Sequence, residues 1–146
     1  MVIHKDRSGQ QKTIVDYYPG AYGPTLRLDF VSRLDLAVLL GHIRALSEDN
    51  ASQLNLLSGL DCDVRNVSSV VAAVTYRSRV VSVTRKMGPD GLIDVLWQQS
   101  TDGWRHTLGL LEGRIATPAA GHQYLSDESV DELLIELALG ERESLR

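Results

Sequence analysis

A histidine, an amide and a phenol stand side by side in the stretch AAGHQYLSD, residues 119–127. An imidazole oriented by a carboxylate is what a general base requires, and acidic residues follow His122. They are Asp127, Glu128 and Asp131. No nucleophile or metal site is identified that would work with this histidine, so a catalytic mechanism would be incomplete. Because His122 and Tyr124 alternate with Gln123, they share one face of a strand, and a structural role is favoured over a catalytic one.

The other residues that chemistry commonly uses are isolated from one another. The remaining histidines are His4, His42 and His106. No two of them are close enough for a helical metal-binding pair, and a single cysteine excludes a four-cysteine zinc site. Cys62 lies between Asp61 and Asp63, whose negative charge raises the pKa of a thiol and disfavours the thiolate. The chain also lacks a Gly-x-Ser-x-Gly motif, and we expect no catalytic residue, cofactor or metal.

Charge and composition narrow the classes of partner. The chain has 15 basic and 19 acidic residues, a net charge of −4, and its basic residues are scattered. Nucleic-acid binding normally needs a basic face, so no nucleic-acid partner is expected. No stretch reaches the roughly 18 apolar residues of a membrane span, and residues 1–12 lack the apolar centre of a signal peptide. With one cysteine in the chain, these features favour a cytoplasmic protein without a membrane partner.

Two segments show the periodicity of helices. Residues 33–47 carry an apolar stripe behind Ser32, a residue type that caps helices, and this predicts the first helix. The second helix is predicted to be capped by Thr101 or Asp102 and to end near Gly113, because glycine commonly terminates helices.

Several other segments favour strands. They are residues 25–30, 53–59, 66–86, 92–100 and 122–125. The turn at Gly88–Gly91 contains proline followed by Asp-Gly between two β-rich runs, which predicts a hairpin. Residues 130–139 match both a helical stripe and strand alternation, and the alternation slightly favours a strand.

The order of these elements indicates an α+β fold. Adjacent strands with helices at two points predict a mostly antiparallel sheet with two helices packed on it, as a single pair of layers. A length of 146 residues with 43% hydrophobic residues suits one core. Residues 1–24 are broken by glycine and proline and are predicted to form an irregular N-terminal arm. Residues 25–146 are then a single α+β domain.

Four pieces of the chain together resemble small bacterial α+β proteins of the immunity-protein kind, which accompany secreted toxins. They are Trp104, LLEG at 110–113, GHQYL at 121–125 and ELALGE at 136–141. The resemblance covers the last third of the chain. It implies a cytosolic, non-enzymatic protein that binds one toxin domain and blocks it.

The leading hypothesis is a non-catalytic protein-binding module, an immunity protein that neutralises a basic bacterial toxin domain. Its expected partner-binding residues are His122, Tyr124, Asp127, Glu128 and Asp131. One alternative is a small enzyme with a site near His122. Another is a secretion chaperone, which requires a homodimer with exposed apolar grooves.

Overall fold

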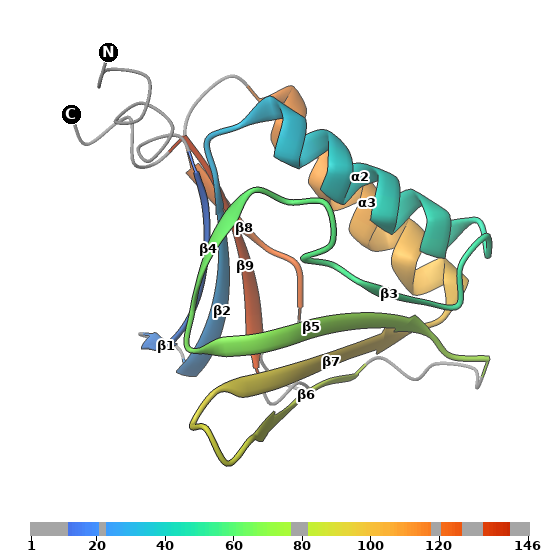
Figure 1. Cartoon of the computed structure of the whole chain (residues 1–146). Helices are drawn as coiled ribbons and strands as arrows, with labels where there is room; N and C mark the ends of the chain where they lie inside the picture. Colours follow the sequence, from blue (N-terminus) through green and yellow to red (C-terminus); the bar gives the residue numbers. More distant parts are fainter. Residues whose placement is uncertain (1–11, 21–22, 77–81, 118–120, 127–132, 141–146) are drawn as a thin grey trace.

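The computed structural model describes residues 12–20, 23–76, 82–117, 121–126 and 133–140 (Figure 1). Its elements in chain order are β1 (Thr13–Gly20), β2 (Gly23–Phe30), α2 (Arg33–Ser47), β3 (Gln53–Asn55), β4 (Cys62–Arg65), β5 (Val67–Val74), β6 (Ser82–Met87), β7 (Ile93–Gln99), α3 (Thr101–Ala116), β8 (Gly121–Tyr124) and β9 (Leu134–Leu139). None of the helices in these ranges is long and apolar enough to cross a membrane.

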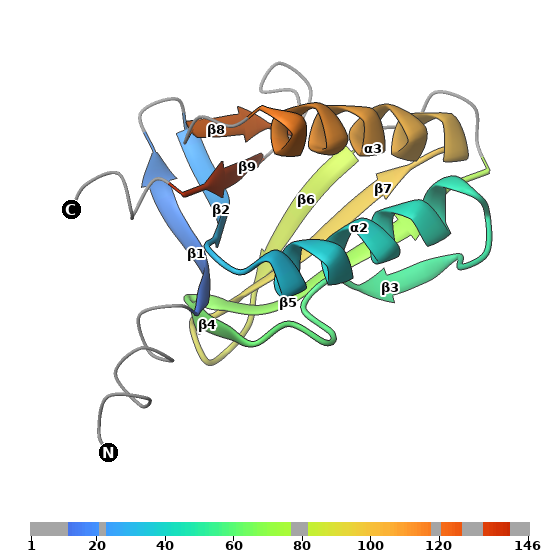
Figure 2. The same ribbon diagram turned by 90° about the horizontal axis from the view of Figure 1, so that it is seen from above.

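The strands divide between two open sheets. One has five strands in the order β4-β1-β2-β9-β8, and the other has four in the order β3-β5-β7-β6. The helices lie side by side over one face of the four-stranded sheet, and the five-stranded sheet stands beside them (Figures 1 and 2). Four of the seven strand pairs are antiparallel.

The predicted α+β class, with mostly antiparallel pairing and two helices, is confirmed. A single sheet was expected, and the strands instead form two. Alternation along a strand shows which of its faces is buried, but it does not show which neighbour the strand pairs with. The pairing of β2 with β9 joins segments far apart in the chain, and no local pattern signals such a pairing.

The prediction of an irregular arm over residues 1–24 was wrong for Thr13–Gly20, which form β1. This strand pairs with β2 from Ile14 opposite Asp29 to Gly20 opposite Gly23. Pro19 and Gly20 occupy the last paired positions of β1, so they mark the end of the pairing with β2 and do not prevent it. The prediction was also wrong for Gly23 and Pro24, which begin β2, and the rest of the predicted arm except Lys12 is outside the described residues.

Both helices begin at serine caps. Ser32 Oγ accepts a hydrogen bond from the Asp35 backbone N–H at 3.4 Å, and α2 spans the predicted residues 33–47. Ser100 Oγ likewise accepts from the Gly103 N–H at 3.1 Å, so the cap of α3 is Ser100 and not Thr101 or Asp102, which lie in its first turn. The predicted end of the second helix near Gly113 was wrong, because that glycine does not take the left-handed conformation of a C-cap and α3 continues to Ala116.

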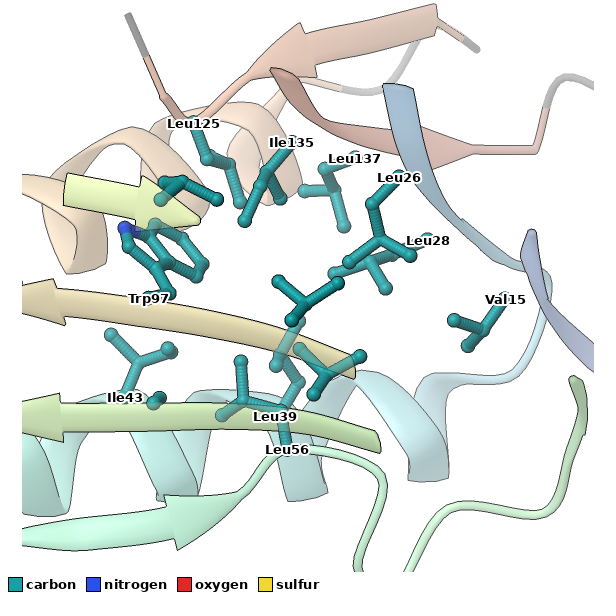
Figure 3. Packing of buried hydrophobic residues seen from close by; sticks show 14 of the residues in the cluster. Val15, Leu26, Leu28, Leu39, Ile43, Leu56, Trp97, Leu125, Ile135 and Leu137 are labelled. Atoms are coloured by element: carbon teal, nitrogen blue, oxygen red, sulfur yellow. The ribbon is translucent and has the colours of Figure 1, made fainter. Parts of the chain in front are cut away.

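One hydrophobic core joins the two sheets and the helices (Figure 3). The five-stranded sheet contributes Val15, Leu26, Leu28, Ile135 and Leu137, and α2 contributes Leu39 and Ile43. Trp97 and Trp104 are 1% and 0% exposed, with ring centroids 4.7 Å apart, so both indoles belong to the core. The Trp104 indole N–H also donates to the Ala73 carbonyl at 3.0 Å.

The ambiguous segment near the C-terminus is the strand β9. It lies between β2, to which it is parallel, and β8, to which it is antiparallel. Residues Leu134–Ala138 are all buried. A central strand that is buried along its length reads as a nearly continuous apolar run, and such a run also fits a helical stripe. The alternation therefore predicted the strand correctly for residues 134–139, and residues 130–132 of the predicted segment are outside the described residues.

Candidate functional site

The face of the five-stranded sheet that points away from the core carries a group of polar side chains. We call this the outer face. In β9, Ile135 and Leu137 point into the core, so Glu136 between them points to the outer face. The strand registers place Arg27 and Tyr124 opposite Glu136, one on each side. These three residues form a row across β2, β9 and β8.

Two more side chains complete this group. Tyr18 of β1 and His122 of β8 also alternate onto the outer face. We define the Glu136 cluster as Tyr18, Arg27, His122, Tyr124 and Glu136. Four strands supply its members, so the backbone hydrogen bonds of the sheet fix their spacing.

The carboxylate of Glu136 is the buried centre of the cluster, with its side chain 7% exposed. The Tyr18 hydroxyl donates to Oε1 at 3.5 Å, and Arg27 Nε lies 3.5 Å from the same oxygen. The other oxygen, Oε2, lies 4.0 Å from His122 Nε2. A buried charge is costly unless it has compensating partners, and the guanidinium and the phenol supply this compensation.

The environment of Tyr18 keeps its phenol in the protonated form that donates. Burial raises the pKa of Tyr18 above its usual 10.0, and the negative charge of Glu136 raises it further. The positive charge of Arg27 acts in the opposite direction without reversing the shift. Tyr18 therefore serves Glu136 as a neutral donor across the physiological pH range.

His122 and Tyr124 pack against each other on the edge strand β8. Their ring centroids are 5.8 Å apart with an interplanar angle of 77°, an edge-to-face arrangement. The His122 side chain is 47% exposed and Tyr124 is half-buried. The prediction that these two residues share one face of a strand is confirmed, and the two rings present an aromatic surface to solvent.

The structure brings together only part of the predicted site. His122 and Tyr124 are neighbours, whereas Asp127, Glu128 and Asp131 lie outside the described residues. Tyr18, Arg27 and Glu136 also belong to the site and were not predicted as its members. Glu136 had a usable signal, because a single charge inside the apolar run LLIELAL marks an ionisable group in a central strand. Tyr18 had none, since it lies 118 positions from Glu136.

The other candidates for chemistry have structural partners or surroundings. His42 Nε2 lies 2.8 Å from the Ser58 carbonyl oxygen, and His106 is exposed on α3. Burial raises the pKa of the Cys62 thiol, with further contributions from Asp35 and Asp61. The direction expected from the flanking acids is correct, but burial is the larger cause, and a protonated thiol is a weak nucleophile.

The imidazole and the carboxylate of the Glu136 cluster are not hydrogen-bonded to each other. At 4.0 Å the gap between His122 and Glu136 exceeds hydrogen-bonding distance, so the carboxylate does not orient the imidazole. In the ranges that the structure describes, no three histidine, cysteine or acidic side chains are placed to hold a metal ion. Comparisons with protein-family models, curated proteins and solved structures found no match to this chain.

Proposed function

We propose that this protein is a non-catalytic protein-binding module that holds its partner on the outer face of the five-stranded sheet. The Glu136 cluster is the observation that carries this proposal. Tyrosine and arginine are enriched at binding hot spots, and this cluster sets two tyrosines and an arginine around one buried carboxylate. Side chains mounted on paired strands lose little freedom when a partner binds, which favours affinity.

The charge of the outer face suggests the kind of partner. Among the described strand residues, this face carries the acidic residues Asp16, Asp29, Asp63 and Glu136 and the arginines Arg27 and Arg65. The excess of acidic side chains favours a basic partner. In this proposal the partner is a basic bacterial toxin domain that the protein neutralises in the cytoplasm, in keeping with the resemblance of the last third of the chain to immunity proteins.

Calorimetry with purified proteins tests the proposal. Each toxin-like protein encoded beside the gene for this chain is titrated with the wild type, with Tyr124→Ala and with His122→Ala. The matched control is Leu34→Ala, which truncates an 80% exposed side chain on α2, away from the outer face. We expect Tyr124→Ala to weaken binding about tenfold or more and the control to bind like the wild type. Equal losses in Tyr124→Ala and Leu34→Ala would place the contact elsewhere.

A small enzyme with a site near His122 is the second candidate. One observation favours it: the 4.0 Å between the imidazole and the Glu136 carboxylate is short enough for one water to bridge. Turnover of a small substrate that disappears in His122→Ala would support the enzyme and count against the binding module. The secretion-chaperone alternative requires a homodimer, so a monomeric mass in solution would remove it.

A further inference from the structure

The two oxygens of the buried Glu136 carboxylate have different surroundings. Tyr18 and Arg27 both approach Oε1 at 3.5 Å. His122 Nε2 lies 4.0 Å from Oε2, which is too long for a hydrogen bond. No hydrogen bond to Oε2 is found in the described chain, and Oε2 is not among the buried side-chain atoms that lack a partner, so this oxygen is in contact with solvent. It is therefore an acceptor that remains available to a donor from outside.

Aromatic rings stand beside this acceptor. His122 and Tyr124 meet edge to face on the adjacent strand, with Tyr124 directly opposite Glu136 in the register. A carboxylate oxygen next to aromatic rings matches the two requirements of a lysine or arginine side chain, an acceptor for its N–H groups and an apolar or π surface for its stem and charge. An anion would meet the negative charge of Glu136 and is disfavoured.

The local charge also favours a cation. Asp29 follows Arg27 by two residues on the same face of β2 and is 6% exposed. A cation that pairs with Glu136 does so in a partly buried environment, where charge pairs are screened less than at the open surface.

The geometry points to one cationic side chain of the partner, a lysine or an arginine, as the group that the Glu136 cluster receives through Oε2, flanked by His122 and Tyr124. This inference rests on the proposed function and specifies the chemistry by which that partner is recognised. It also assigns Tyr18 and Arg27 the role of positioning residues, because they hold Oε1 and leave Oε2 free.

Nuclear magnetic resonance titration of the full isotope-labelled chain provides the test. The probes are Nα-acetyl-arginine methylamide and Nα-acetyl-lysine methylamide, and the matched neutral probe is Nα-acetyl-citrulline methylamide. We expect at least one cationic probe to shift the His122, Tyr124 and Glu136 signals saturably, with a Kd on the order of millimolar. The citrulline probe should bind at least tenfold more weakly.

Variants of the chain show whether the response belongs to this site. Glu136→Gln should abolish the saturable shifts, and His122→Ala serves as a second variant because its ring is half exposed and its loss leaves the core intact. Asp63→Asn removes an exposed carboxylate from the same face and should leave binding unchanged. Shifts spread over all exposed acids, or shifts that survive in Glu136→Gln, would overturn the inference.

The two proposals fail in different ways. If Tyr124→Ala weakens binding of the toxin domain while neither cationic probe shifts Glu136, the cation site is wrong and the binding face stands. If the toxin domain binds Tyr124→Ala and Leu34→Ala as tightly as the wild type, the outer face is not the interface and both proposals fall.

Discussion

Tyr18 and Glu136 are 118 positions apart in the chain and meet on the outer face of the five-stranded sheet, where the phenol donates to the carboxylate at 3.5 Å. Tyr18→Phe removes this donor from a carboxylate that is mostly buried. We expect the free energy of unfolding to fall by about 1 kcal/mol, measured by urea denaturation.

Tyr76→Phe is the matched control for this substitution. Its hydroxyl also donates to a carboxylate, that of Asp49, at the shorter distance of 2.8 Å, but the residue is 73% exposed. Water replaces an exposed hydrogen bond readily, so the control should lose less stability than Tyr18→Phe. The reverse order would mean that the length of these bonds matters more than their burial.

Alkaline pH should destabilise the protein partly through Tyr18. Its pKa is raised in the folded state by burial and by Glu136, so above about pH 10 the unfolded chain loses a proton that the folded chain retains. The contribution of Tyr18 to the free energy of unfolding is then fully present below the pKa of the unfolded chain. It is lost as the pH rises towards the higher pKa of the folded chain. Denaturation midpoints between pH 9 and 11 should fall less steeply in Tyr18→Phe than in the wild type. Parallel curves would contradict this linkage.

Asp35 links three parts of the fold. One carboxylate oxygen accepts from the Thr13 hydroxyl of β1 at 2.5 Å, and the other accepts from the Asp61 N–H before β4 at 3.2 Å. Asp35→Ala leaves both donors without this acceptor, and we expect a loss of about 2–3 kcal/mol in the free energy of unfolding. Asp102 occupies the first turn of α3 but is 87% exposed, so Asp102→Ala should have a much smaller effect in the same measurement.

Replacing helix glycines by alanine should stabilise the protein at two positions and destabilise it at a third. At Gly41 and Gly109 an added Cβ meets nothing within 4 Å, so alanine should stabilise each helix by about 0.5–1 kcal/mol through its higher helix propensity. At Gly103 the Cβ would lie 2.9 Å from Gln99 Cβ, and Gln99 is 5% exposed. Thermal unfolding should show higher midpoints for the first two variants and a lower one for Gly103→Ala.

Local signals predicted local structure well in this chain. The Ser32 cap and its apolar stripe defined α2, and the turn at Gly88–Gly91 joins β6 to β7 with a hydrogen bond from the Gly91 N–H to the Gly88 carbonyl at 3.0 Å. β1 was missed because Pro19 and Gly20 at its end masked the alternation of the residues before them. The division into two sheets was also missed, because it depends on pairings between distant segments.

The members of the candidate site were likewise predictable only where they belong to one strand. His122 and Tyr124 could be assigned to one face from a period of two, because they belong to one strand. Arg27 joins Glu136 only because β2 and β9 are parallel neighbours in a particular register. Since a shift of one residue would move Glu136 to the core face, the cluster exists only in the folded sheet.

The parallel pairing of β2 with β9 has a consequence for synthesis on the ribosome. Thr25 is opposite Leu134, so the N-terminal hairpin of β1 and β2 must wait for 109 further residues before its open edge is covered. Until then, the unpaired backbone of β2 is a template for other nascent chains. Proteins stalled or truncated before Leu134 would expose this edge permanently, and they should be substrates for chaperones and proteases.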